Sequence, residues 1–260
     1  MSRVEQAFAK GKALIPFITA GDPDLKTTEQ LILEMARAGA DLIELGIPFS
    51  DPIAEGPVIQ RASMRALQAG TTTDKILALV SRVREKSDVP LAFVTYINPI
   101  FAFGIERFMH NSREAGIDAL IIPDLPFEEK GEILPYCREY GIDLISMIAP
   151  TSKERISIIA QEAQGFVYCV SSLGVTGVRE KIGTEAENMV AMVKAVKDIP
   201  CAVGFGIASP EQAWQISQTA DGVIVGSAIM QIVEQYGAGC IPQVSAYIRQ
   251  MKQAINQHKD

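Results

Sequence analysis

Short apolar runs alternate with longer amphipathic segments along almost the whole chain, and this alternation constrains the fold more than any other feature. It is typical of parallel strands that helices cover on both faces. Helical patterns fill the gaps, for example over residues 27–37 and 73–86, and a short helix over 2–9 precedes the first strand. The eight predicted strands are ALIPFITA from Ala13, DLIELGI from Asp41, LAFVTYIN from Leu91, ALIIPDL from Ala119, DLISMIA from Asp143, FVYCVS from Phe166, CAVGFGI from Cys201 and GVIVGS from Gly222.

Eight strand–helix units can form a closed barrel or an open, doubly wound sheet. No GxGxxG motif follows the first strand, and no Pro/Gly-rich linker divides the chain. The 260 residues, of which 48% are hydrophobic, suit one barrel. We therefore predict an α/β fold, a single (β/α)8 TIM barrel over residues 1–260 with an extra N-terminal helix. In such barrels the catalytic groups lie at the carboxyl ends of the strands.

A weak internal repeat supports this division into units. Gly39-Ala40-Asp41, Gly116-Ile117-Asp118 and Gly141-Ile142-Asp143 each follow a helical pattern and open an apolar run. Glycine suits the left-handed residue that ends a helix. Ordinary loop chemistry is sufficient to explain this repeat.

Charge and composition exclude several classes of function. The net charge of -7 repels nucleic-acid phosphates. No apolar run approaches the roughly 20 residues that span a bilayer, and the N-terminus has no apolar signal region, so we expect a cytoplasmic protein. The four cysteines form no CxxC pair and are expected to be reduced. With only His110 and His258 available, a histidine metal site or a Ser-His-Asp triad is almost excluded, and we predict no metal.

Glu44 is the strongest anomaly, because it is an acid in the middle of the apolar strand LIELG. An unpaired carboxylate in a core costs several kcal/mol, so its pKa is raised or the group is paired. Perturbed carboxyls favour active sites, but a glutamate that pairs with a basic side chain in the helix layer would give the same pattern. The pattern alone weighs these two readings about equally.

The loop after this strand, IPFSDPIAEGPVIQ, is long and carries two further acids, Asp51 and Glu55. Asp51-Pro52 is also a common turn-forming pair, so these residues could instead serve only to shape the loop. Long loops at this face are nevertheless where barrels place catalytic groups. A second carboxylate opposite Glu44 is geometrically reasonable.

Glycines at the ends of the last two strands predict a phosphate site. Gly204-Phe205-Gly206 precedes a helix start at Ser209-Pro210-Glu211, and Gly226-Ser227 closes the eighth strand and opens the next helix. Glycines after strands seven and eight, beside helix N-terminal amides, form the usual phosphate cradle of these barrels. Tight strand packing is the alternative reading. The small residues of 171–178 suit a lid, although a mobile surface loop would look the same.

The positions of the lysines and histidines exclude two classes of aldolase. A Schiff-base aldolase needs a lysine at a strand end, but Lys12, Lys153, Lys181 and Lys194 fall at segment starts, in loops or in helices. A metal aldolase needs histidine ligands, which the chain does not offer. Cleavage of a phosphorylated substrate by carboxylates alone implies acid–base chemistry on a substrate that can accept the electrons itself.

Several long motifs, in this order and at these spacings, resemble the tryptophan synthase alpha subunit family. The resemblance runs from the first strand to the last. The motifs are PFITAGDP from Pro16, IELGIPFSDPIAEGPVIQRA from Ile43, YINPI from Tyr96, PDLP from Pro123, GVTG from Gly174, GFGIASPEQ from Gly204 and VGSAI from Val225.

The resemblance implies a lyase that cleaves indole-3-glycerol phosphate to indole and D-glyceraldehyde 3-phosphate in a retro-aldol step. Glu44 matches the family's catalytic glutamate, which moves protons between indole C3 and the glycerol hydroxyl. Glu55 matches a second acid, which stabilises the charge at the indole N–H. The family usually carries aspartate at this position, so the longer Glu55 requires the loop to absorb one extra methylene.

The same matching assigns the rest of the site. Thr176 would belong to a lid that orders Glu44. The indole pocket would be lined by Phe17, Ile59, Tyr96, Ile121 and Tyr168, although core packing explains these residues too, and for Ile121 nearly as well. The phosphate would be held by Gly177, Gly206, Gly226 and Ser227.

The family works as an alpha2beta2 heterotetramer with a beta subunit that carries pyridoxal phosphate, so no cofactor is expected in this chain. Asp51 and Asp124 match positions at the partner interface, an assignment that rests on the resemblance alone. Two alternatives stay open: a stand-alone lyase that releases free indole, and a non-catalytic activator of the beta subunit, with Glu55 as a sign of lost activity.

Overall fold

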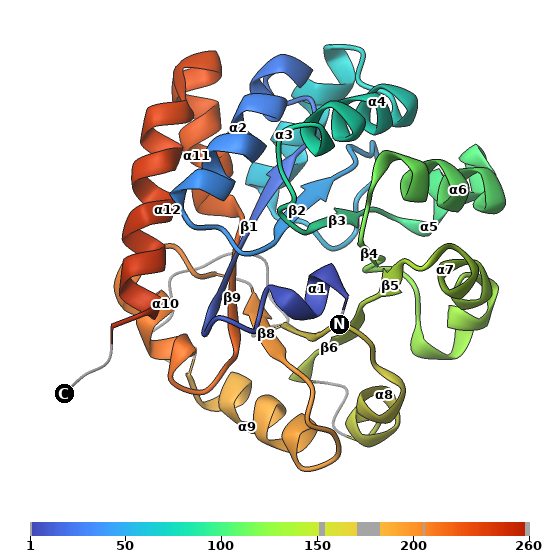
Figure 1. Cartoon of the computed structure of the whole chain (residues 1–260), viewed down its shortest axis with the longest axis vertical. Coiled ribbons are helices and arrows are strands. Elements are labelled where there is room, and N and C mark those ends of the chain that lie inside the picture. The colour runs from blue at the N-terminus through green and yellow to red at the C-terminus, as the bar shows by residue number, and fades with distance from the viewer. Residues whose placement is uncertain (1, 151–153, 171–182, 205, 258–260) are drawn as a thin grey trace.

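The strands of the computed structural model form one parallel sheet that returns to itself (Figure 1). The structure describes residues 2–150, 154–170, 183–204 and 206–257. Within them the sheet order is β5-β4-β3-β2-β1-β9-β8-β7-β6. The strands are β1 (Ala13–Thr19), β2 (Ile43–Gly46), β3 (Leu91–Val94), β4 (Ala119–Ile121), β5 (Asp143–Leu144), β6 (Ser146–Ile148), β7 (Val167–Val170), β8 (Cys201–Gly204) and β9 (Gly222–Val225).

The two edge strands, β5 and β6, are parts of one predicted run that only Ile145 separates. β5 pairs with β4, and β6 pairs with β7, so this run joins the two ends of the sheet. The backbone amide of Ile145 itself donates to the Leu120 carbonyl at 2.9 Å. The predicted barrel of eight strands is confirmed.

Helices surround the barrel (Figure 1), and α10 begins with the predicted Ser209 cap and Pro210. The predicted left-handed glycines end α2, α6 and α7 with φ of 110° at Gly39, 96° at Gly116 and 64° at Gly141. The helices are α1 (Arg3–Gln6), α2 (Leu25–Ala38), α3 (Pro57–Gln68), α4 (Thr73–Arg84), α5 (Ile97–Phe103), α6 (Ile105–Ala115), η1 (Phe127–Glu132), α7 (Leu134–Tyr140), α8 (Ile156–Glu162), α9 (Gly183–Lys194), α10 (Pro210–Ser217), α11 (Ser227–Tyr236), η3 (Gly237–Gly239) and α12 (Ile241–Ile255).

The third strand is shorter than the sequence predicts. β3 ends at Val94, and Tyr96 is the N-cap of α5 rather than a strand residue. The chain enters α5 at Ile97, and Pro99 lies in the first turn of this helix, where proline is tolerated. The first amide of α5, that of Ile97, donates to Asp124 Oδ1 at 3.0 Å.

Strand alternation decides which side chains enter the barrel. In β2, Ile43 and Leu45 belong to the apolar layer between the strands and the helices. Leu42, just before β2, belongs to a second apolar cluster, which includes Val4 of α1 and fills the barrel interior. Glu44 therefore faces inward, one layer above Leu42.

Helix α1 closes the end of the barrel at which the strands begin. Phe8, just after this helix, lies 5.4 Å from the Phe166 ring between ring centroids. A Cβ added to Gly165 or Gly222 would lie 3.0 Å from Val4 or Phe8, respectively, so glycine allows this close approach. With this end filled, a ligand can enter the barrel at the carboxyl ends of the strands.

Candidate active site

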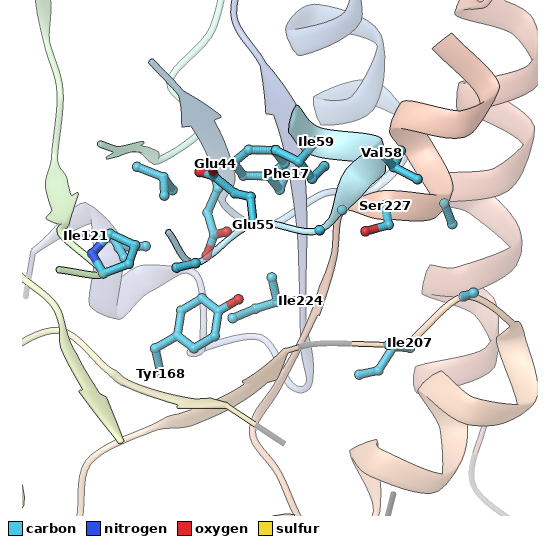
Figure 2. A pocket seen from close by; sticks show the side chains of 18 of the residues that line it. Phe17, Glu44, Glu55, Val58, Ile59, Ile121, Tyr168, Ile207, Ile224 and Ser227 are labelled. Atoms are coloured by element: carbon cyan, nitrogen blue, oxygen red, sulfur yellow. The ribbon is translucent and has the colours of Figure 1, made fainter. Parts of the chain in front are cut away.

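A cavity of about 480 Å³ lies at the carboxyl ends of the strands (Figure 2), a size typical of small-molecule sites. Its wall comes from strand ends and from the loops that follow β2, β4, β8 and β9. The lining residues are Phe17, Glu44, Ala54, Glu55, Gly56, Val58, Ile59, Val94, Ile121, Pro123, Met147, Tyr168, Gly206, Ile207, Ala208, Ile224, Gly226, Ser227, Ala228 and Gln231.

Glu44 lies deep in this cavity. Its register partners are Phe17 in β1 and Ala92 in β3, and the residue is 2% exposed. Burial raises the pKa of Glu44 to about 8. Among the residues that the structure describes, no group donates a hydrogen bond to Glu44 Oε1. Glu44 is therefore directed at the cavity, and no basic residue of the described helix layer pairs with it.

Glu55 reaches the same cavity from the loop between β2 and α3 (Figure 2). Burial raises its pKa to about 7; a hydrogen bond with Tyr96 lowers the pKa, and the charge of Asp124 raises it. Its Oε2 atom is buried and has no hydrogen-bond partner within the described part of the chain. This oxygen is therefore available to a hydrogen-bond donor of a ligand.

Tyr96 occupies a different place from the one the resemblance suggests. It is 2% exposed and does not line the cavity. Its hydroxyl accepts a hydrogen bond from the Ala54 amide at 3.0 Å and bonds with Glu55, and its ring lies 5.3 Å from that of Phe49. The short β3 is the reason, because Tyr96 leaves the sheet and turns behind the Glu55 loop. Tyr96 thus holds that loop and does not form the pocket wall.

The other predicted wall residues, Phe17, Ile59, Ile121 and Tyr168, do line the cavity. Tyr168 fits because Gly204 has no side chain: a Cβ there would lie 2.5 Å from the Tyr168 hydroxyl. The sequence interpretation missed several apolar members, although strand alternation at the strand ends could have found some of them. These members are Val58, Val94, Met147, Ile207 and Ile224.

The predicted phosphate residues meet on another side of the cavity. Gly206, with φ of 79°, follows β8, while Gly226 is the N-cap of α11 and Ser227 is its first residue. In Figure 2, Ser227 and Ile207 lie toward one side of the view, and Glu44 and Glu55 toward the other. No Lys or Arg occurs among the described lining residues, so an anion here would rely on backbone amides and the Ser227 hydroxyl.

Some predicted residues are not part of this cavity. Asp51 is exposed on the Glu55 loop and accepts a hydrogen bond from Ser50 Oγ, while Asp124 accepts the Ile97 amide at the start of α5. Thr176, Gly177 and the predicted lid at 171–178 lie outside the described residues.

The described ranges contain no cluster of three or more His, Cys, Asp or Glu side chains that could hold a metal ion. Within those ranges, no helix has both the length and the apolar character needed to cross a membrane. The four cysteines are free thiols buried in the fold.

Comparison with known proteins gives a consistent result. A family model described as "Tryptophan synthase alpha chain" matches residues 4–257. The tryptophan synthase alpha chain of Geobacter sp. (strain M21) is 48% identical over 262 residues, covering 98% of each chain. That of Thermoanaerobacter sp. (strain X514) is 47% identical, covering 98% of this chain and 100% of its own.

Solved structures agree with these relatives. The structure of Mycobacterium tuberculosis tryptophan synthase is 35% identical with a TM-score of 0.90, and the match covers 99% of each chain. The crystal structure of the tryptophan synthase alpha chain from Legionella pneumophila subsp. pneumophila is 38% identical with a TM-score of 0.88, and the match covers 98% of each chain.

Proposed function

The chain belongs to the tryptophan synthase alpha chain family, and from this premise we propose that it cleaves indole-3-glycerol phosphate to indole and D-glyceraldehyde 3-phosphate. It is a lyase of tryptophan biosynthesis. The observation that carries the assignment is a pair of buried carboxyls, Glu44 and Glu55, in one cavity whose other side is formed by glycines and the N-terminus of a helix.

Glu44 is the acid and base of this proposal. With a pKa raised to about 8 it holds a proton at neutral pH and donates it to C3 of the indole ring. The resulting carboxylate takes the proton of the adjacent glycerol hydroxyl, whose O–H electrons form the aldehyde carbonyl. The bond between C3 and the glycerol carbon breaks, and its electron pair returns to the ring. Indole leaves, and Glu44 is protonated again.

Glu55 stabilises the charged ring in this scheme. Its unpartnered Oε2 accepts the indole N–H while Tyr96 holds the carboxyl. This role needs the carboxylate, whereas Glu44 must begin as the acid. The pKa is about 7 for Glu55 and about 8 for Glu44, so Glu55 is ionised while Glu44 is still protonated between pH 7 and pH 8.

The phosphate occupies the other side of the cavity. Gly206, Gly226 and Ser227 bind it through amides and a hydroxyl, and the N-terminus of α11 favours its negative charge. The family resemblance also assigns Gly177 to the phosphate and Thr176 to the lid, and both residues lie outside the described part of the chain. Phe17, Ile59, Ile121 and Tyr168 hold the ring.

We also infer that the chain acts in the cytoplasm with a tryptophan synthase beta subunit, as an alpha2beta2 complex. Asp51 and Asp124 lie at that interface, as the family resemblance implies. Pyridoxal phosphate belongs to the beta subunit, where it supplies the chemistry that joins indole to serine. The proposed alpha reaction uses no cofactor in this chain.

A structure with a non-cleavable indole-alkyl phosphate tests the site. The ring should lie on Glu55 and the phosphate on Gly226 and Ser227; a phosphate bound elsewhere would overturn the assignment. Indole release should be measured for the unaltered protein, Glu44→Gln and Glu55→Asp, each with and without beta subunit. A rise in turnover with beta subunit supports the complex, no rise indicates a stand-alone lyase, and no release in either condition would contradict the enzyme.

A further inference from the structure

Four charged side chains outside the cavity form a connected network, here called the Glu234 clamp: Asp22, Arg61, Arg65 and Glu234. Arg61 donates from Nε and Nη2 to the two carboxylate oxygens of Glu234 at 2.7 and 2.9 Å. Arg65 donates from Nη1 to Glu234 Oε1 at 2.8 Å. Its other two nitrogens, Nε and Nη2, donate to Oδ1 and Oδ2 of Asp22, both at 2.8 Å.

The clamp runs from an exposed arginine, Arg61, at 53% exposure, to a buried acid. The Asp22 side chain is fully buried, and those of Arg65 and Glu234 are each 32% exposed. Both arginines use the planar fork that binds a carboxylate at two points, and Arg65 joins two acids at once. The two arginines lower the pKa of Glu234 to about 2, so the clamp stays charged at neutral pH.

Each element that the clamp joins carries part of the cavity wall. Asp22 lies in the turn after β1, which supplies Phe17. Arg61 and Arg65 lie on α3, which begins directly after Glu55 and Gly56. Glu234 lies on α11, which begins at Ser227. At a rise of about 1.5 Å per residue, the ion pairs lie about one to two turns behind the two helix N-termini that face the cavity.

We propose that the Glu234 clamp is a positioning device that fixes the separation between the Glu55 end of the cavity and its phosphate end. The inference rests on the proposed function, in which one substrate must reach both ends at once. A ligand that spans both ends gains affinity because its second contact is intramolecular, and this gain depends on the spacing of the two subsites. A ligand that occupies one end does not depend on that spacing.

The test compares three ligands: indole, glycerol 3-phosphate and a non-cleavable indole-alkyl phosphate that joins both groups. Glu234→Gln removes the charge that connects α3 to α11 but leaves the Arg65–Asp22 pair in place. Calorimetry should show the spanning ligand weakened roughly ten- to a hundredfold, as expected for a shift on the ångström scale. Indole and glycerol 3-phosphate should bind within about twofold of the unaltered protein, because neither depends on the spacing.

Glu29→Gln is the matched control. Glu29 also accepts from two cations, Arg82 Nε and Lys86 Nζ, each at 2.8 Å, but it joins α2 to α4 away from the cavity. It should leave all three affinities unchanged, so a general loss of stability is separated from a loss of spacing. Arg61→Met should reproduce the pattern of Glu234→Gln in weaker form, because Arg65 still reaches Glu234.

Three outcomes overturn the inference. Equal weakening of the spanning ligand and of both fragments in Glu234→Gln would indicate local disorder and no spacing role. Unchanged binding of all three ligands would show that the clamp does not act on the cavity. Failure of the unaltered protein to bind any of the three would refute the proposed function itself and, with it, this inference.

Discussion

Three acids at the start of the barrel strands and two acids at the strand ends differ in their hydrogen-bond and ion-pair partners. Where the strands begin, Asp41, Asp118 and Asp221 each accept the backbone amide of a neighbouring strand at 2.7–2.9 Å and also a lysine or arginine. Where the strands end, Glu44 and Glu55 each keep a buried oxygen without a partner in the described structure. Asp41, Asp118 and Asp221 thus serve pairing where the strands begin, whereas Glu44 and Glu55 stay available where the strands end, beside the paired Asp22.

This contrast indicates that the acids at the strand starts stabilise the fold, whereas those at the strand ends are available for catalysis. A buried polar atom without a hydrogen bond costs about 1–3 kcal/mol, so its persistence needs another explanation. At the strand starts the acids close the sheet and bind the helices to it. At the strand ends the same cost leaves two carboxyls free for a ligand, which agrees with the usual division of this fold into a stabilising and a catalytic face.

The largest effect on kcat should follow from replacing Glu44 at the catalytic end of the barrel. Glu44→Gln keeps the size of the side chain but removes its proton transfer, and kcat should fall by at least about a thousandfold. Indole release under single-turnover conditions measures the loss. Asp41→Asn, at the start of the same run, should reduce stability and leave kcat within about threefold, since its partners are structural. Equal kcat losses in both variants would remove the distinction between the two ends.

A substitution at the end where the strands begin should lower the free energy of unfolding and leave kcat unchanged. Arg84 Nη2 lies 2.6 Å from Asp118 Oδ2, and both side chains are nearly buried. Arg84→Met leaves Asp118 with only the longer pair to the more exposed Arg3, and it removes the donor of three backbone carbonyls. Unfolding in urea should show a loss of about 3–5 kcal/mol, with kcat of the folded protein unchanged. Arg82→Met, on the same helix but 47% exposed, should cost no more than about 1 kcal/mol. A similar cost for both variants would contradict this role of Arg84.

Much of this contrast could be predicted from the sequence, because it depends on local periodicity. Eight apolar runs gave the strands, but alternation alone left open whether Glu44 faces the barrel interior or the helix layer. The structure places it on the inward face, two residues after Leu42. The glycines that end α2, α6 and α7 were also predictable, since the left-handed conformation is a property of one residue.

Other features depend on residues that are distant in the sequence. Arg65 contacts Asp22 and Glu234, which are 43 and 169 positions away, and nothing local indicates either pair. Tyr96 was assigned to a strand because the run LAFVTYIN appears continuous, while the structure ends the strand at Val94.

A smaller effect is expected at Glu55. Glu55→Gln removes the negative charge near the indole N–H and should lower kcat about a hundredfold, a typical cost for one stabilising group. The pH profile of kcat should also lose its limb near pH 7, because the titrating carboxyl is gone. Glu55→Asp keeps the charge but shortens the reach, so its loss should be smaller. A profile of Glu55→Gln that retains the limb would contradict the role of Glu55.

The smallest effect on activity is expected from Tyr96→Phe, which tests how Tyr96 acts on Glu55. Its hydroxyl lowers the pKa of Glu55, so Tyr96→Phe should raise that pKa and move the acidic limb of kcat/KM to higher pH. Activity needs the Glu55 carboxylate, so kcat/KM near pH 7 should fall by about tenfold or less. More alkaline buffer should not restore it fully, because Glu44 loses its proton near pH 8. Phe49→Leu, which alters the ring contact but not the hydroxyl, should leave the limb in place. An unmoved limb in Tyr96→Phe would show that the hydroxyl does not act through Glu55.

The proton held by Glu44 is the feature on which the mechanism depends, and an isotope-edited infrared titration measures it directly. The unaltered protein should show a protonated-carboxyl band that is missing from Glu44→Gln and that disappears near pH 8, because burial raises the pKa to about 8 from an ordinary 4.5. A Glu44 band that disappears near pH 4.5 would show an ordinary, solvated carboxylate. That result would contradict its assignment as the acid that protonates the ring.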